Sequence, residues 1–403
     1  MNESLNLDWL ISVDDHILEP PKLWTDRVAK KDLDRAPHME TINGTEYWLY
    51  DGKRFPSSGL SAVVGRSKEE FSPDPLPYAE MRPGCYDATA RIEDMDRAGI
   101  LASLCFPTIT RFCGQLFMEA SDREFGFECL QHYNDWLIEE WCGAAPGRYI
   151  PLMLIPMWDP ALAATEMERM AAKGVTAFAF SENPAPLGLP TIHDSEGYWD
   201  PVMAAANDLE MVVCMHVGSS SQLPQIAPDA PFMANLTWGA SRTSGTMLSW
   251  LFSGLFQRHS NLKIALSEGE VGWIPYFLER AEQVLDKQRY WVMRGQTFGD
   301  HAKAQIVDLD SLDIRQSFRD HVFGCFIEDH HGIASIDEIG EDNIMCETDY
   351  PHSDSTWPDC IGTAQRVIKN LSPEVQYKVL RGNAERLYRF TPAEPPTPKP
   401  VGA

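Results

Sequence analysis

The sequence predicts an α/β protein in which a strand and a helix alternate eight times, the pattern of a distorted (β/α)8 or TIM barrel. Three observations support this fold class: eight short apolar, β-favouring runs, amphipathic segments between them, and a length of 403 residues. That length suits one large barrel with insertions. The alternative is an open doubly wound sheet, but no glycine-rich phosphate loop follows the first strand.

The predicted strands are apolar along almost their whole length, as parallel strands covered on both faces require. They span residues 10–13, 100–106, 149–155, 175–180, 211–216, 263–267, 322–326 and 343–348.

The segments between these strands have helical periodicity, with proline near several starts and glycine just past several ends. The predicted helices span residues 87–98, 121–144, 160–173, 197–209, 246–259, 273–290 and 332–339, with a final pair over 360–381.

Three segments exceed what a barrel needs, and long loops in compact domains are usually lids, binding loops or oligomer contacts. Residues 25–86 are expected to form a small hairpin insertion after strand one. Residues 218–245 form a long loop after strand five, and residues 291–320 follow helix six. The proline-rich tail 392–403 should be extended. We expect a single domain over residues 1–403.

Composition excludes several classes of partner and location. With 34 Lys and Arg against 59 Asp and Glu, the formal charge of −25 would repel nucleic acid and anionic membranes. No apolar stretch is long enough to span a bilayer, and the first residues lack the pattern of a signal peptide. The nine cysteines include no CxxC pair, which indicates a reducing compartment. We therefore expect a cytoplasmic protein without a nucleic-acid or membrane partner.

Histidine and acidic residues cluster where the predicted strands end. They are Asp14 and His16 after strand one, His216 at the end of strand five, Glu268 after strand six, and Asp349 and His352 after strand eight. The carboxyl ends of barrel strands converge on one mouth, so these residues should become neighbours. Two imidazoles and two carboxylates drawn from these six side chains form a ligand set suited to Zn, Fe or Mn. Each residue alone also has a plainer reading, as a helix cap or a hydrogen-bonded structural histidine.

The chain resembles the amidohydrolase-related family in two runs, ISVDDHILEPPKLW near its start and NIMCETDYPHSDSTWPD near its end. That family includes the aminocarboxymuconate semialdehyde and resorcylate decarboxylases. The run SEGYWDPVMAAANDLEMVVCMHVG resembles the family's approach to the metal-binding histidine of strand five, and GNAERLYRF resembles its closing helix. The resemblance extends from about residue 11 to residue 390, excluding the insertions.

The resemblance implies the fold and a set of metal ligands. It carries over to Asp14 and His16 as the first-strand ligands, to His216 on strand five and to Asp349 on strand eight. One departure stands out. The family's decarboxylases place a histidine after strand six, where this chain has Glu268.

Two mechanisms follow from this ligand set. In the first, one divalent ion activates water, Glu268 carries protons, and Asp349 and His352 complete the catalytic group of a hydrolase or decarboxylase. In the second, Glu268, His352 and Glu19 complete a second metal site, and a pair of iron or manganese ions makes the protein an oxygenase. A third reading is a catalytically silent structural subunit of a hetero-oligomer.

The expected ligands and partners are a divalent ion (Zn, Mn or Fe, one or two per chain) and a small carboxylated substrate. Arg111 is placed to meet a carboxylate, and Trp357 to wall an apolar pocket, although a solvated arginine and plain aromatic packing explain them equally well. We expect a homo-oligomer, most simply a dimer, because residues 25–86 and 291–320 would otherwise expose aromatic surface. A hetero-oligomer is the open alternative.

Overall fold

The computed structural model divides into two compact units. Unit 1 comprises Met1–Ile109, Asp135–Pro151 and Met345–Ala403, and unit 2 comprises Thr110–Asn134 and Leu152–Ile344. The structure describes residues 5–222, 225–239, 241–292 and 307–396. A single domain over the whole chain stays a prediction.

Unit 1 contains a parallel sheet with the strand order β1 (Leu10–Ile17), β5 (Ile100–Pro107), β6 (Tyr149–Ile150). Every residue of β1 is buried. The pairing of β1 with β5 shifts between Ser12 and Asp15, which marks a β-bulge. The strand is longer than predicted, so Asp14 and His16 lie inside it and not after it. Polar residues in a strand weaken the apolar signal on which the prediction relied.

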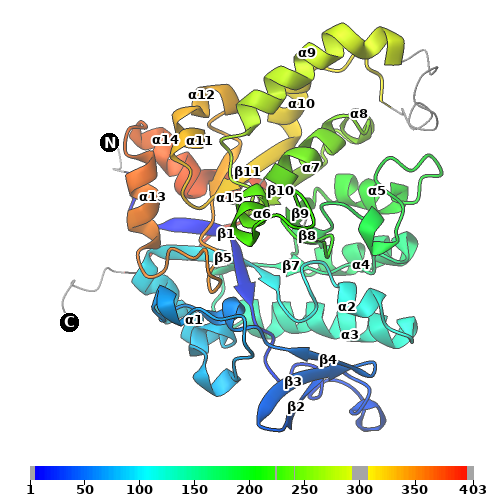
Figure 1. The fold of residues 1–403 in the computed structure, drawn as a ribbon, viewed down its shortest axis with the longest axis vertical. Coiled ribbons are helices and arrows are strands. Elements are labelled where there is room, and N and C mark those ends of the chain that lie inside the picture. Colours follow the sequence, from blue (N-terminus) through cyan, green and yellow to red (C-terminus); the bar gives the residue numbers. More distant parts are fainter. Residues whose placement is uncertain (1–4, 223–224, 240, 293–306, 397–403) are drawn as a thin grey trace. The chain divides into compact units, whose positions relative to one another are not determined.

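The insertion after strand one contains a second sheet, shown in blue in Figure 1. Its antiparallel strands are β2 (His38–Ile42), β3 (Thr45–Tyr50) and β4 (Lys53–Pro56). The predicted hairpin is thus a three-stranded sheet. Its aromatic surface is also less exposed than expected, because Trp48 is buried with its ring edge-on to Trp24 at 5.5 Å.

The larger sheet runs in sequence order from β7 to β12. Its strands are β7 (Leu152–Met153), β8 (Ala177–Phe180), β9 (Val212–His216), β10 (Lys263–Ser267), β11 (Val322–Phe326) and β12 (Ile344–Cys346). Pairing is parallel from β7 to β11. The predicted third run is interrupted at Pro151, which has no backbone N–H to donate. The α/β class with parallel strands is confirmed, and closure into a barrel stays a prediction.

Helices follow most of the strands, as predicted. Unit 1 has α1 (Ala88–Ala98), α13 (Cys360–Ile368), α14 (Pro373–Tyr377) and α15 (Asn383–Leu387). The helix α3 (Arg123–Trp136) continues as a π-helical turn over Leu137–Cys142. Unit 2 has α2 (Gln115–Met118), α4 (Pro160–Ala171), α5 (Asp200–Asp208), α6 (Phe232–Gly239), α7 (Ser241–Leu251), α8 (Leu255–Arg258), α9 (Ile274–Val292), α10 (Ile314–His321), α11 (His330–Ala334) and α12 (Ile336–Ile339).

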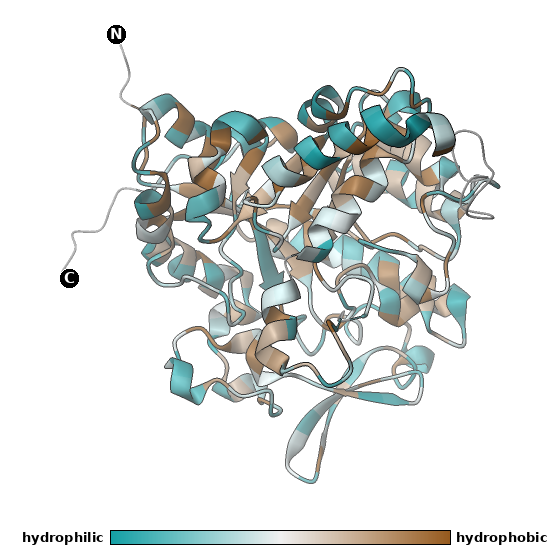
Figure 2. Cartoon of the chain, turned by 45° about the horizontal axis from the view of Figure 1, so that its top comes forward, coloured by the Kyte–Doolittle hydropathy of each residue, from teal (hydrophilic) through white to brown (hydrophobic). Residues whose placement is uncertain are grey.

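Two of the predicted loops contain helices. The segment 218–245 includes α6 and the start of α7, and the end of the segment 291–320 forms α10. Residues 293–306 and the last part of the tail lie outside the described residues. In Figure 2 many helices combine brown apolar and teal polar residues, the usual amphipathic division, whereas the strands are not uniformly apolar. No described helix combines the length and the apolarity needed to cross a membrane.

Candidate metal-binding site

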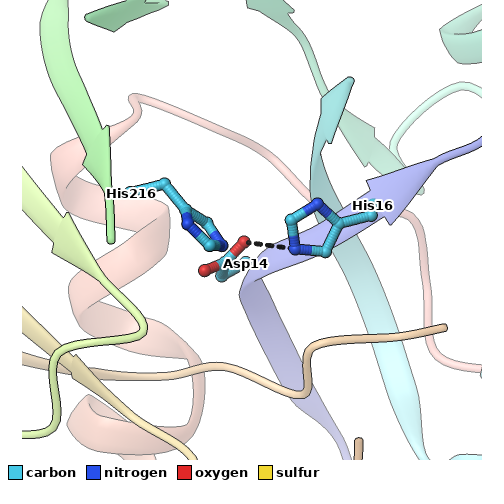
Figure 3. Close-up of side chains that lie close together, drawn as sticks. All are labelled: Asp14, His16 and His216. Carbon is cyan, nitrogen blue, oxygen red and sulfur yellow. Dashed lines mark ion pairs between the residues drawn. The ribbon is translucent and has the colours of Figure 1, made fainter. Parts of the chain in front are cut away.

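Asp14 and His16 lie together on β1, as Figure 3 shows. Both side chains are fully buried, and His16 Nε2 is 3.6 Å from Asp14 Oδ1. The bulge between Ser12 and Asp15 turns the strand at this point. Asp14 and His16, two positions apart on one strand, are thus in contact.

The backbone holds Asp349 beside them. Asp349 N donates to Asp14 O at 2.9 Å, and His16 N donates to Tyr350 O at 2.6 Å, so the chain after β12 is fastened to β1. As a result Asp349 Oδ1 lies 3.1 Å from His16 Nε2. Burial raises the pKa of the Asp349 carboxyl, but His352 and His16 outweigh it, and the pKa is lowered far below its ordinary value.

His352 completes this cluster in unit 1. Its ring stacks on His16 with centroids 3.6 Å apart, and its Nδ1 is 3.2 Å from Asp349 Oδ1. One ligand atom from each of His16, Asp349 and His352 lies within 4.8 Å of the other two. Two imidazoles and a carboxylate, of which only His352 is partly exposed, suit a divalent transition metal.

Two buried residues that the sequence reasoning missed support the cluster. Asp15 Oδ1 accepts hydrogen bonds from Ser12 Oγ at 2.9 Å and Thr348 Oγ1 at 2.6 Å. Arg91 Nη2 donates to His16 O at 2.6 Å. Burial raises the pKa of Asp15 despite Arg91 and the three hydroxyl donors around it. The doubled acid of the run SVDDH was the available signal for Asp15.

Two other predicted residues of unit 1 are held by neighbouring groups. Glu19 Oε2 accepts from Ile109 N at 2.9 Å. Trp357 Nε1 donates to Asp94 O at 3.1 Å, and its ring lies 4.6 Å from the Arg82 guanidinium carbon. That Glu19 binds a second metal remains a prediction, and so does the role of Trp357 in lining a substrate pocket.

In unit 2, His216 ends β9 and Glu268 follows β10, so adjacent parallel strands bring the two residues together. His216 Nε2 is 3.6 Å from Glu268 Oε2. Figure 3 shows the His216 ring at the end of its strand. His216 Nδ1 donates to Val217 O at 2.6 Å, and Phe112 stacks on the ring with centroids 4.2 Å apart. With its proton on Nδ1, the neutral imidazole keeps a lone pair on Nε2 for a metal.

Arg111 is engaged with an acid of its own unit. Its Nη1 donates to Glu119 Oε1 at 2.6 Å and its Nη2 to Glu119 Oε2 at 3.2 Å. A substrate carboxylate would have to replace Glu119 in this bidentate pair.

A second charge pair in unit 2 was not anticipated. Glu182, just after β8, accepts from Arg242 Nη2, and the two atoms lie 2.9 Å apart. Burial raises the pKa of Glu182, although Arg242 and the neighbouring hydroxyl and amide donors oppose that rise. The signal was present in the sequence, because Glu182, like His216 and Glu268, lies at the carboxyl end of a strand.

The donor set of each unit fits a divalent ion. Unit 1 presents Asp14, His16 and Asp349 as buried donors and His352 as a partly buried one. Unit 2 presents a histidine with an oriented Nε2 next to a carboxylate. These are the donor types that Zn, Mn and Fe take in proteins.

Comparison with known proteins identifies relatives of this chain. Residues 35–390 match the profile of the family described as Amidohydrolase. The gamma-resorcylate decarboxylase of Rhizobium radiobacter is 28% identical over 283 residues, which cover 67% of this chain and 78% of that enzyme. The gamma-resorcylate decarboxylase of Polaromonas sp. is 27% identical over 338 residues, covering 79% and 93% of the two chains.

Solved structures share the fold. An amidohydrolase from Mycobacterium avium subsp. paratuberculosis aligns with a TM-score of 0.69 and 21% identity over 94% of this chain and 97% of its own. A dihydroxybenzoic acid decarboxylase from Polaromonas sp., with bound manganese and the inhibitor 2-nitroresorcinol, aligns with a TM-score of 0.60 and 20% identity over 96% and 99%.

These similarities confirm the resemblance drawn from the terminal motifs. They also confirm the expectation of an enzyme that uses a divalent metal, and the reading as a catalytically silent subunit is set aside.

Proposed function

Because the chain belongs to the amidohydrolase family, we propose that it is a metal-dependent decarboxylase acting on a small carboxylated aromatic compound. The observation that carries this proposal is the buried contact of His16 with both Asp14 and Asp349. The decarboxylase names of its relatives favour loss of CO2 over hydrolysis.

We assign Asp14, His16, His216 and Asp349 as the metal ligands. An ion bound there would act as a Lewis acid on an oxygen of the substrate. His352 Nδ1, 3.2 Å from Asp349 Oδ1, orients that carboxylate. Arg111, by exchanging Glu119 for the substrate, and Trp357 are the proposed substrate contacts.

Glu268 is the proposed proton carrier. When the bond between the ring carbon and the carboxyl group breaks, its electron pair stays on the ring and CO2 leaves. The ring carbon then takes a proton, which a protonated Glu268 would supply in place of the histidine of related decarboxylases.

The first test combines metal content with CO2 release. We expect about one zinc or manganese per chain in protein purified without chelator, and CO2 release from dihydroxybenzoates, which are carboxylated aromatics of the proposed class. Asp349→Asn should lower that release by at least about a hundredfold because it weakens a ligand. Asp337→Asn, which changes an exposed acid in the first turn of α12, is the matched control and should stay active.

Glu268 is tested in the same assay. Glu268→Gln should lower kcat and remove one limb of the pH–rate profile, whereas Glu270→Gln should leave kcat and both limbs of the profile unchanged.

Two metals per chain with iron among them, together with oxygen consumption, would instead support the dinuclear oxygenase. The observation that favours this alternative is the pairing of Glu268 with His216. Absence of both metal and CO2 release would contradict the proposal.

A further inference from the structure

The buried pair of Glu182 and Arg242 takes no part in the proposed chemistry, yet it contacts the loop that follows His216 in unit 2. Arg242 Nη2 lies 2.9 Å from Glu182 Oε1, and the two side chains are only 13% and 5% exposed. A charge pair buried to this extent stabilises a fold little, because desolvation of the two groups opposes their attraction. The other groups that bond to the Glu182 carboxylate therefore indicate what the pair does.

One peptide group lies between Glu182 and His216, the one that joins Val217 to Gly218. Its oxygen, Val217 O, accepts a hydrogen bond from His216 Nδ1 at 2.6 Å. Its N–H, on Gly218, donates to Glu182 Oε1 at 3.0 Å. Because a peptide group is planar and rigid, the two bonds depend on each other. A rotation that takes the N–H away from Glu182 also takes the oxygen away from the imidazole.

Glu182 is itself held at several points. Its Oε1 accepts from Ser220 Oγ at 2.9 Å as well as from Arg242. Its backbone N–H donates to Ser219 Oγ at 2.8 Å. Both the backbone and the carboxylate of Glu182 are thus bonded to the loop after β9, which restrains the rotation of that peptide.

The backbone at Gly218 is adapted to this arrangement. Its φ is +91°, a conformation that residues other than glycine rarely adopt. A Cβ there would lie 3.4 Å from Phe112 Cε2, and the Phe112 ring stacks on His216 with centroids 4.2 Å apart. The glycine therefore permits the turn that brings the next two residues back to Glu182.

We propose that Glu182 is a positioning residue for His216 and acts through the peptide between Val217 and Gly218. With that peptide fixed, Val217 O keeps the Nδ1 proton of His216 and holds the ring in one orientation, so that Nε2 is the ligand atom. Groups that hold the second ring nitrogen of a ligand histidine contribute about 10- to 100-fold to metal affinity. The inference rests on the proposed function, because it takes His216 as a metal ligand.

Calorimetric titration of the metal-free full chain with Mn²⁺ tests this inference. The double substitution of Glu182→Leu with Arg242→Met removes both charges and leaves no lone arginine in the interior. Such replacements of a buried ion pair often preserve stability. Because Gly218 N loses its acceptor, the folded double variant should bind Mn²⁺ about tenfold or more weakly than the unsubstituted chain.

Two single variants separate the length of the side chain from its charge. Glu182→Gln keeps the length, and its amide oxygen can still accept from Gly218 N, so Mn²⁺ binding should weaken about threefold at most. Glu182→Asp keeps the charge beside Arg242 but is one methylene shorter, so it should bind about tenfold more weakly. A role confined to the ion pair predicts the reverse order.

A spectroscopic measurement follows the imidazole without any metal. In the chain labelled with ¹⁵N at histidine, the ring nitrogens of His216 should show a single tautomer with the proton on Nδ1. The double variant should show a mixture of the two tautomers. The signals are assigned by their loss in His216→Gln.

A matched control removes another largely buried pair. Arg381 Nε lies 2.7 Å from Glu385 Oε1, and both side chains contact Tyr377 of the same segment. Glu385→Leu with Arg381→Met should bind Mn²⁺ as the unsubstituted chain does. Thermal melting of every variant checks that it is folded.

The outcomes separate this inference from the proposed function. Equal Mn²⁺ affinity of Glu182→Asp and the unsubstituted chain, or an unchanged His216 tautomer in the double variant, would overturn the positioning role and leave the metal-dependent enzyme intact. Absence of Mn²⁺ binding by the unsubstituted chain would contradict the proposed function, and the inference with it.

Discussion

Three of the predicted site residues have a left-handed backbone, which side chains other than glycine rarely adopt. The φ angles are +59° at Arg111, +56° at Glu268 and +51° at Asp349. Each follows the end of a strand, where the chain must turn sharply. Such conformations cost free energy and persist where the surrounding structure imposes them, often at functional sites.

The backbone strain at Glu268 predicts an unusual order of stability. Glu268→Gly should be more stable than Glu268→Ala by about 1 kcal/mol, because glycine adopts positive φ without the Cβ clash. Both variants lose the carboxylate, so the difference isolates the backbone. Urea denaturation of the two proteins measures it.

An exposed helical position provides the comparison. At Glu279 in α9 the order should reverse, with alanine favoured by about 1 kcal/mol. An equal stability of the glycine and alanine variants at Glu268 would contradict the strained backbone.

Among the secondary-structure elements, the end of α10 carries a buried histidine that links it to its neighbours. His321 Nδ1 donates to Leu262 O at 2.7 Å, and its ring stacks on Phe256 with centroids 4.4 Å apart. Burial lowers the pKa of His321 below its usual value of 6.5, although the bond to Leu262 works against this. The neutral imidazole is therefore the form that the fold favours.

This gives stability a pH dependence of definite sign. Between the folded-state pKa and about 6.5, the unfolded chain binds more protons at His321 than the folded chain does. The free energy of unfolding should therefore fall as the pH drops below about 6.5. His321→Gln, which can still donate to Leu262 O, should flatten this slope in urea titrations at several pH values. The exposed His330→Gln should not change it, and an unchanged slope in His321→Gln would refute the assignment.

At the scale of the whole molecule, an exposed apolar surface on α6 is the basis for predicting self-association. The helix contains no charged residue, and Phe232, Met233, Leu236 and Trp238 are each about half exposed or more. The evidence for the expected dimer is therefore the exposed surface of α6. It is not the insertion at 25–86, because Trp48 in that insertion is buried.

Light scattering tests the dimer. We expect a mass of twice the 45.4 kDa of one chain, and a shift toward the monomer when Phe232 and Met233 are both replaced by serine. Tyr276→Ser, on the exposed surface of α9, should leave the mass unchanged. A monomer mass for the unsubstituted chain would contradict the prediction.

The sequence by itself was sufficient for the α/β class, for strands such as 263–267 and 322–326, and for the family. Buried parallel strands are continuous apolar runs, and this signal is local. The same logic located His216 and Glu268 at adjacent strand ends. The same logic predicted a β1 that was too short, because Asp14, Asp15 and His16 interrupt the apolar pattern.

Only the tertiary structure decided how these residues are held. The stack of His352 on His16, the support from Arg91 and the engagement of Arg111 by Glu119 depend on side-chain packing between segments distant in the chain. The pair of Glu182 and Arg242 likewise arises because the chain brings the segment after β8 beside α7. Sequence periodicity describes which face of an element is buried, whereas the partner of a given polar atom is set by the three-dimensional path of the whole chain.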